Sequence, residues 1–243
     1  MAQLSSRAAG AVALGFSIEG TGPAAVLRGP RPGYQAPGNL VTFPFSFEDG
    51  WPVVTARLNG GVTAPFIFDT GAAYTALEGR TAARAGVRTV RTNDIPVRNV
   101  HGIGGMEHSC VGLLDSFALG ALEITNMPVH VRLEETKAGS RRHRGNSLLG
   151  LVPAIAGFSY VTIDYPLSLI TVAPREEFRP SGSGTRAPLR LPFVIKDGSL
   201  RVMLGLPKGH DAEFLVDTGM GGEICLSMAT IDNAGLGNIH LRS

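Results

Sequence analysis

Two short stretches of the sequence each place a carboxylate directly after an apolar run. The first is FIFDTG, with its acid at Asp69, and the second is FLVDTG, with its acid at Asp217. A carboxylate in such a position is costly to bury in its ionised form. One Asp-Thr-Gly alone would be interpreted as an ordinary turn, in which the glycine permits a tight backbone. Two of them raise the question of whether the acids act together.

The two turns lie at matching positions of an internal repeat. Residues 43–71 align without a gap on residues 191–219 at an offset of 148, and twelve of the twenty-nine pairs are identical. With one inserted residue the match continues to the AGV of residues 85–87 and the AGL of residues 234–236. A duplicated unit predicts a pseudo-twofold axis, with equivalent turns facing each other across it.

Facing carboxylates at Asp69 and Asp217 would form a site for hydrolysis. Two carboxylates held close together cannot both ionise comfortably, so the pair shares a proton. The ionised member can take a proton from a water that lies between them, while the protonated member donates to the carbonyl oxygen that the water attacks. This chemistry hydrolyses a peptide bond with neither a metal nor a covalent intermediate.

The segments that must position these acids have the pattern of short β-strands. From Leu40 onward, apolar runs of strand length are separated by turn signals such as EDG, NGG and GIGG, which favours an all-β barrel or sandwich. The runs are LVTFPFSF, WPVVTARL, APFIFD, CVGLLDSFAL, MPVHVRL, YVTIDY and LSLITVAP. One segment, Leu77 to Val87, is predicted to be a helix that ends near Gly86.

Composition divides the chain into four parts. Residues 1–39 are rich in Gly, Ala and Pro and are predicted to be a flexible tail or leader. Residues 40–179 form the first lobe, residues 180–187 a linker, and residues 188–243 a partial second lobe. The run AAGAVALGF after Arg7 resembles the apolar core of a secretory signal but lacks a clear cleavage site. Export to the periplasm or medium and a cytoplasmic location are therefore both left open.

Charge and spacing argue against several classes of protein. The contents of 44% hydrophobic and 17% charged residues suit a soluble globular protein, and the formal net charge of +2 gives almost no information about partners. The basic run RRHR at residues 141–144 has no interleaved aromatic residues, so no nucleic-acid partner is expected. No apolar run is long enough for an integral membrane helix. His101, His108 and Cys110 lack a fourth ligand at a useful spacing, so neither a metal nor another cofactor is predicted.

The paired Asp-Thr-Gly turns resemble those of the aspartic proteases, and specifically of the retropepsin-like branch found in bacterial two-copy proteins. The resemblance implies a retropepsin- or pepsin-like closed β-barrel lobe, duplicated, with one short helix in each lobe. It also implies an aspartic endopeptidase that acts on peptide or protein substrates, with Asp69 and Asp217 as the catalytic acids. Aspartic proteases are the reference case for a shared-proton pair, so that behaviour is taken from them. The active-site loops would further contain two cross-linking threonines and two glycines that pass beside the carboxylates: Thr70, Thr218, Gly71 and Gly219.

Two further segments of the first repeat fit the same family. NVHGIGGMEHSC resembles the glycine-rich flap hairpin that closes over substrate, and a plain hairpin is the alternative. The substrate-binding tip of this flap would be Gly102, Ile103, Gly104 and Gly105. The segment NSLLG resembles the apolar-apolar-Gly signature, so that Leu148, Leu149 and Gly150 would pack as core behind the active-site loop. The segment VTIDYPLSLITV would form the closing hairpin.

The second repeat is shorter than the first. Leu148 follows Asp69 by 79 residues, and the same distance from Asp217 would fall near position 296, whereas the sequence ends at Ser243. We therefore expect a second lobe without flap or backing strands, and with unpaired strand edges. Three interpretations compete: a fragment of a longer protein, a truncated and inactive peptide-binding β-domain, or a homodimer that uses Asp69 from each chain. The first two are favoured, because a duplicated start has little purpose in the third.

Overall fold

The structure is a computed structural model that describes residues 17–19, 26–90, 98–102, 105–133, 147–150, 157–179, 189–221 and 224–237. Four predicted features lie wholly or partly outside these residues: the leader segment after Arg7, the flap-tip residues Ile103 and Gly104, the basic run at 141–144, and the linker at 180–187. No helix in the described part of the chain has the length and apolar character needed to cross a membrane.

The described residues are mostly β-strand, as predicted. The strands up to residue 90 are β1 (Ser17–Glu19), β2 (Val26–Arg28), β3 (Gly33–Gln35), β4 (Val41–Pro44), β5 (Ser46–Glu48), β6 (Trp51–Leu58), β7 (Val62–Asp69), β8 (Ala76–Leu77) and β9 (Arg88–Val90). They continue with β10 (Arg98–Gly102), β11 (Gly105–Leu119), β12 (Leu122–Arg132), β13 (Ser147–Gly150), β14 (Tyr160–Asp164), β15 (Leu169–Ala173), β16 (Phe193–Lys196), β17 (Ser199–Leu206) and β18 (His210–Leu215). The helices are α2 (Gly79–Arg84), the 3-10 turn η2 (Pro207–Gly209) and α4 (Met228–Asn233).

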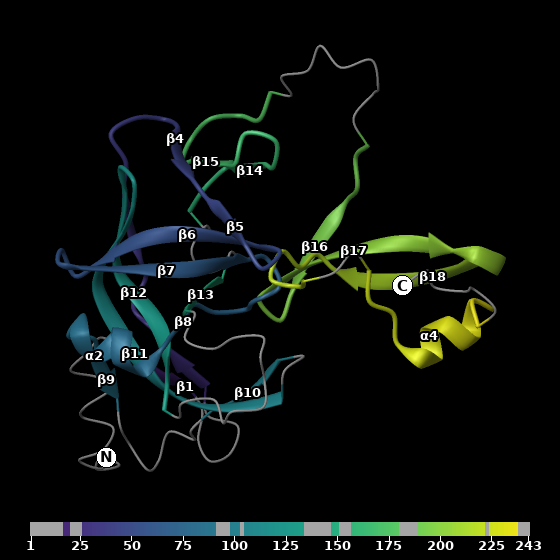
Figure 1. Ribbon diagram of the computed structural model, residues 1–243, viewed down its shortest axis with the longest axis horizontal. Coiled ribbons are helices and arrows are strands. Elements are labelled where there is room, and N and C mark those ends of the chain that lie inside the picture. The colour runs from purple at the N-terminus through teal and green to yellow at the C-terminus, as the bar shows by residue number, and fades with distance from the viewer. Residues whose placement is uncertain are drawn as a thin grey trace.

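The strands of the first lobe close into a barrel (Figure 1). Strand pairing runs from β11 through β12, β8, β13, β7 and β6, and returns to β11 where Phe117 pairs with Leu58. Strands β3, β5, β9 and β10 extend this sheet, while β4, β14 and β15 form a separate three-stranded sheet. Strand β7 of this barrel ends at Asp69, the first residue of the Asp-Thr-Gly turn.

One apolar core fills the barrel. From Val54 onward, buried and exposed side chains alternate along β6, and Val54, Ala56 and Leu58 are fully buried. The rings of Phe66 and Phe117 meet edge to face, with their centroids 5.2 Å apart. Burial of these large side chains fixes the register of β7, and with it the position of Asp69 at the strand's end.

Strand β3 extends the first lobe into the segment predicted to be a flexible tail. Its residues pair with β12, and Tyr34 packs edge to face on Phe158, with ring centroids 5.1 Å apart. The lobe therefore begins N-terminal of the predicted boundary at residue 40. Surrounding Gly and Pro residues hid this strand, because three residues are too few to show alternation.

The strands of the second lobe recur at the positions that the repeat predicts. The bounds of β6 and β17 differ by the repeat offset of 148. The turns before these strands both have positive φ, at 51° and 88° for Asp49 and Gly50 and at 53° and 76° for Asp197 and Gly198. Matching turns before matching strands are what a duplication would produce.

Each lobe also carries one short α-helix, as expected. The predicted helix at Leu77 to Val87 exists as α2 but begins later, because Leu77 belongs to β8 and Glu78 caps the helix by accepting from the N–H of Thr81. Helix α4 is capped in the same way by Ser227. Glycines with a φ of 64° follow both helices, at Gly86 and Gly235.

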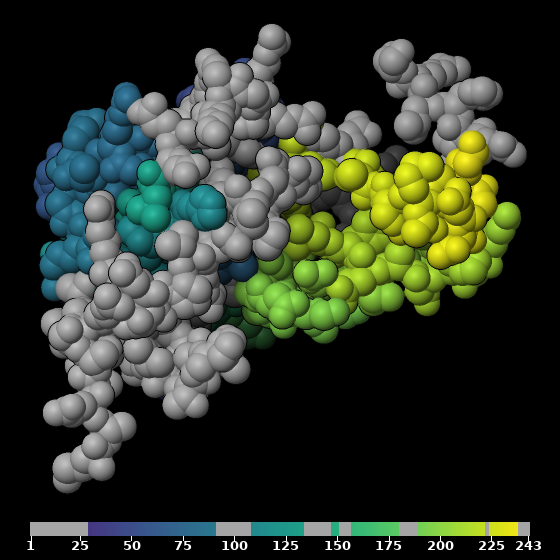
Figure 2. Space-filling view, turned by 90° about the horizontal axis from the view of Figure 1, so that it is seen from below, coloured from purple at the N-terminus to yellow at the C-terminus, as the bar shows by residue number. Residues whose placement is uncertain are grey.

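The second lobe is open. Strands β16, β17 and β18 form a three-stranded sheet that projects from the barrel, and green and yellow atoms form a separate mass on one side in Figure 2. Ile67 in β7 is fully buried, whereas its repeat equivalent Leu215 in β18 is 39% exposed. Ile195 is 60% exposed and Met203 is 58% exposed. Among the described residues no strand pairs with the outer edges of β16 and β18.

Candidate active site

The two Asp-Thr-Gly turns meet through a reciprocal set of hydrogen bonds between their threonines. The N–H of Thr70 donates to Oγ1 of Thr218 at 3.1 Å, and the N–H of Thr218 donates to Oγ1 of Thr70 at 3.0 Å. Each hydroxyl then donates into the opposite strand, from Thr70 to the carbonyl of Val216 at 2.6 Å and from Thr218 to that of Phe68 at 2.5 Å. The bonds repeat about a pseudo-twofold axis, and they lock the ends of the two apolar strands together.

The glycines of the two turns lie against the opposite carboxylates. A Cβ atom built on Gly71 would lie 2.6 Å from Cγ of Asp217, and one built on Gly219 would lie 2.5 Å from Cγ of Asp69. Real Cβ atoms do not approach another carbon so closely, so a larger residue could not occupy either position without a shift. The two acids are thereby brought next to each other and to the opposite turn.

Backbone amides hold each carboxylate in place. Oδ1 of Asp69 accepts from the N–H of Gly71 at 2.8 Å and from the N–H of Ala72 at 3.0 Å. Oδ1 of Asp217 accepts from the N–H of Gly219 at 2.8 Å. These bonds orient both side chains and stabilise their ionised forms.

The environment of Asp69 nevertheless favours its protonated form. Burial raises the pKa of Asp69 to about 7, and the charge of Asp217 and a hydrogen bond with that carboxyl act in the same direction. The amide bonds from Gly71 and Ala72 oppose the rise without cancelling it. One proton held by two adjacent carboxyls is the state expected of such a pair.

Strand β13 supports the first turn from behind. It pairs in parallel with β7, with Leu149 opposite Phe68 and Gly150 opposite Asp69. A Cβ atom on Gly150 would lie 2.9 Å from the carbonyl oxygen of Ala72, so only glycine fits where the loop crosses the strand. Leu149 is buried in the core and Leu148 is partly buried.

The predicted flap segment forms a hairpin. Strands β10 and β11 pair antiparallel, and Gly102 pairs with Gly105 at the end of the ladder. Ile103 and Gly104 of its tip lie outside the described residues. The backbone therefore contains the hairpin that both the flap and the plain-hairpin interpretations require.

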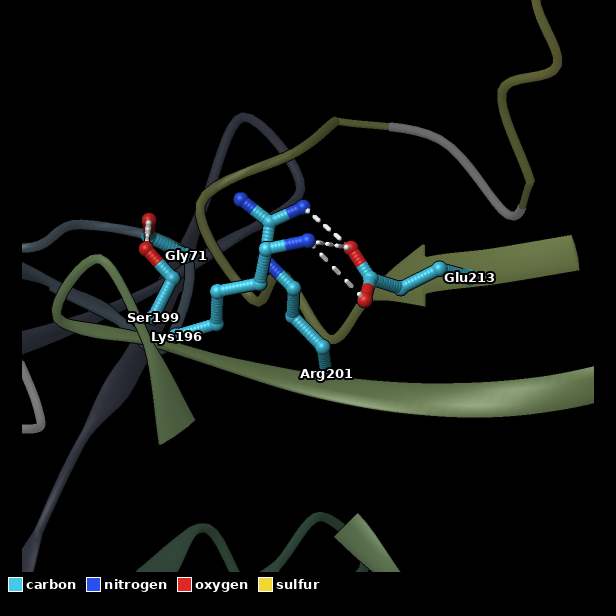
Figure 3. A network of polar contacts seen from close by, with 5 residues as sticks. All are labelled: Gly71, Lys196, Ser199, Arg201 and Glu213. Atoms are coloured by element: carbon cyan, nitrogen blue, oxygen red, sulfur yellow. Dashed lines mark hydrogen bonds and ion pairs between the residues drawn. The ribbon is translucent and has the colours of Figure 1, made fainter. Parts of the chain in front are cut away.

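Sequence reasoning missed two contacts that join the lobes at this site. The hydroxyl of Ser199, at the start of β17, donates to the carbonyl of Gly71 at 3.1 Å (Figure 3). At the repeat-equivalent position, the ring of Trp51 lies against Gly221 in the second turn, with Nε1 3.6 Å from the place a Cβ would take. Both residues directly follow an Asp-Gly turn, and that shared position was the available signal.

Comparisons with known proteins find a similarity in the central part of the chain. Residues 54–151 match the family model described as aspartyl protease. The matched segment contains Asp69 and ends just after Gly150, so Asp217 lies outside it. No curated protein sequence matches the chain.

One similar solved structure is described as a retropepsin-like aspartic protease from Rickettsia conorii. It is 23% identical, the alignment covers 58% of this chain and 92% of that one, and the TM-score is 0.38. The match to the family model at residues 54–151 covers less than half of the chain.

Proposed function

We propose that the chain is an aspartic endopeptidase in which Asp69 and Asp217 form the catalytic dyad, and the match of residues 54–151 to the aspartyl protease model supports this proposal. The observation that carries the proposal is the reciprocal threonine bonding, which sets the two acids side by side. Peptides or proteins are the substrate class that the family implies.

The proposed reaction uses one proton shared by two carboxyls. Asp69 is favoured to hold it in weakly acidic solution, since its pKa is about 7. Asp217 then takes a proton from a water placed between the acids, and that water attacks the carbonyl carbon of the scissile peptide. Asp69 donates its proton to the carbonyl oxygen as the tetrahedral intermediate forms. Collapse of that intermediate breaks the C–N bond, and the nitrogen leaves with a proton from the dyad.

The direct test is cleavage of an unfolded protein substrate by the wild type and by Asp69→Asn and Asp217→Asn. Each variant keeps the size of the side chain but cannot act as a carboxylate, so we expect each to lose turnover at least 10²-fold. Asp49→Asn is the matched control, because Asp49 lies exposed in a turn of positive φ that asparagine also adopts. Turnover that persists in Asp69→Asn at the control's rate would rule out the dyad.

The open second lobe favours one alternative, a domain that holds peptides without cleaving them. In the part of the chain that the structure describes, the outer edges of β16 and β18 have no strand partner, and an extended peptide could add there as a further strand. Peptide binding that survives in an Asp69→Asn/Asp217→Asn double variant, with no cleavage by the wild type, would support it. A homodimer that pairs Asp69 from each chain is harder to accommodate, because Asp217 would first have to leave its place beside Gly71.

A further inference from the structure

The Gly71–Ala72 peptide group bonds to the second lobe on one side and to Asp69 on the other. Its carbonyl oxygen accepts from the hydroxyl of Ser199 at 3.1 Å, and its N–H donates to Oδ1 of Asp69 at 3.0 Å. A carbonyl oxygen can only accept, so the hydroxyl proton must point toward Gly71. The result is a chain of two bonds that runs in one direction, from Ser199 through a single peptide to the carboxylate.

The β16–β17 turn holds Ser199 in position for this contact. Asp197 and Gly198 both have positive φ, and Lys196 pairs with Ser199 across the turn. A Cβ atom on Gly198 would lie 3.0 Å from Cβ of Ala73, so this turn is pressed against the first active-site loop. The Ser199 residue itself is only 6% exposed, which keeps competing water away from the bond.

We propose that Ser199 is a positioning residue for Asp69: its hydroxyl, donated across the lobe boundary, orients and polarises the Gly71–Ala72 peptide group whose N–H donates to the carboxylate. Hydrogen bonds in a chain strengthen one another, so loss of the hydroxyl weakens the donor that stabilises ionised Asp69. Among the residues that the structure describes, Asp217 is the charged group that acts on Asp69, and Ser199 changes no charge beside either.

The two repeats carry different residues at this position. The position equivalent to Ser199 in the first lobe is Trp51, whose indole packs on Gly221. The loop of Asp69 is thus contacted from the opposite lobe by Ser199, whereas the loop of Asp217 is contacted by Trp51. Such a difference would help one member of a symmetric pair to hold the proton in preference to the other.

The test is a titration of the Asp69 carboxyl by carbon-13 NMR in the full chain, in the wild type and in Ser199→Ala. We expect the midpoint to rise on the order of a few tenths of a pH unit, since polarisation strengthens a neighbouring bond by roughly 10–30%. Ser199→Thr keeps the hydroxyl and should restore the wild-type midpoint. Ser199→Cys, a weaker donor of similar shape, should lie between them and serves if the alanine variant does not fold. Ser46→Ala is the matched control, because the Ser46 hydroxyl is exposed and bonds to Glu48.

An unchanged midpoint in the alanine variant, or equal shifts in the alanine and threonine variants, would overturn the proposal. The role of Ser199 in catalysis rests on the proposed function, but this titration does not require turnover. If the shift is seen but the chain never cleaves peptide, the proposed endopeptidase activity is refuted while the positioning role of Ser199 is supported. A chain that cleaves peptide without the shift would support the enzyme proposal and refute the positioning role.

Discussion

At the scale of single residues, Asp69 combines a charge-stabilising amide cradle with a position that disfavours charge. The N–H groups of Gly71 and Ala72 stabilise the carboxylate, yet burial and the adjacent Asp217 raise its pKa to about 7. Because the pKa of a free aspartate is near 3.8, the folded state binds more protons than the unfolded state between these values. Keeping Asp69 in this position therefore lowers the free energy of unfolding by an amount that depends on pH.

This linkage predicts how stability changes with pH. A folded pKa above the unfolded pKa means that the free energy of unfolding falls as pH rises from about 4 to about 7. Asp69→Asn removes the titrating group and should flatten that part of the curve. Urea denaturation at a series of pH values measures the effect, with Asp49→Asn as the control that keeps the slope. Equal slopes in the wild type and Asp69→Asn would contradict the assigned pKa.

At the scale of elements, the ends of β7 and β18 are joined by hydroxyls rather than by a continuous sheet. Oγ1 of Thr70 accepts from the N–H of Thr218 and donates to the carbonyl of Val216. Thr70 is only 4% exposed, so removal of its hydroxyl would leave two poorly hydrated backbone groups without these bonds. The contact between lobes thus depends on a few buried polar atoms.

The corresponding prediction concerns Thr70→Val, which preserves shape but deletes the hydroxyl. We expect a loss of about 1–3 kcal/mol in the free energy of unfolding, the usual cost of an unsatisfied buried polar group. Thr70→Ser should recover most of it. Thr42→Val is the matched control: the exposed Thr42 hydroxyl bonds to Thr171, and surface changes usually stay within about 0.5 kcal/mol. Equal losses in Thr70→Val and Thr42→Val would contradict the role given to Thr70.

The elements also show which parts of the molecule can be predicted from sequence. Apolar runs between turn signals predicted strands such as β6, and the repeat drew attention to Asp69 and Asp217 because both acids recur at one offset. The contact between Ser199 and Gly71 could not be predicted, since it joins residues 128 positions apart and depends on how the lobes meet. Strand β3 was missed for a different reason, because its pairing with β12 follows from tertiary packing and not from local pattern.

At the scale of the whole molecule, the described strands of the two lobes form sheets of different kinds. The first lobe is a closed barrel, whereas the second is a three-stranded sheet with exposed apolar side chains. Lys196 and Arg201 both pair with Glu213 on that sheet, at 3.3 Å and 2.9 Å, as Figure 3 shows. These ion pairs are partly exposed to solvent, which screens them, so they contribute little to stability. The sheet is held mainly by its own ladder and by its contacts with the first lobe.

The exposed sheet predicts self-association of the chain. Apolar side chains on an unpaired sheet favour contact with a second copy, which would bury them. Sedimentation velocity over a range of concentrations should show a dimer for the wild type and a weaker dimer for Ile195→Lys. Leu167→Lys is the matched control, since Leu167 is 67% exposed on the first lobe. Identical sedimentation of the wild type, Ile195→Lys and the control would show that this sheet does not mediate association.

The measurement that tests the central claim most directly is the titration of Asp69 with and without Asp217→Asn. If the two acids form one dyad, the Asp69 midpoint lies near pH 7 in the wild type. It should fall in the variant, because the neighbouring charge is gone, yet stay above the value of a free aspartate, because burial remains. A midpoint that does not move when Asp217 is replaced would show that the two carboxylates do not share a proton.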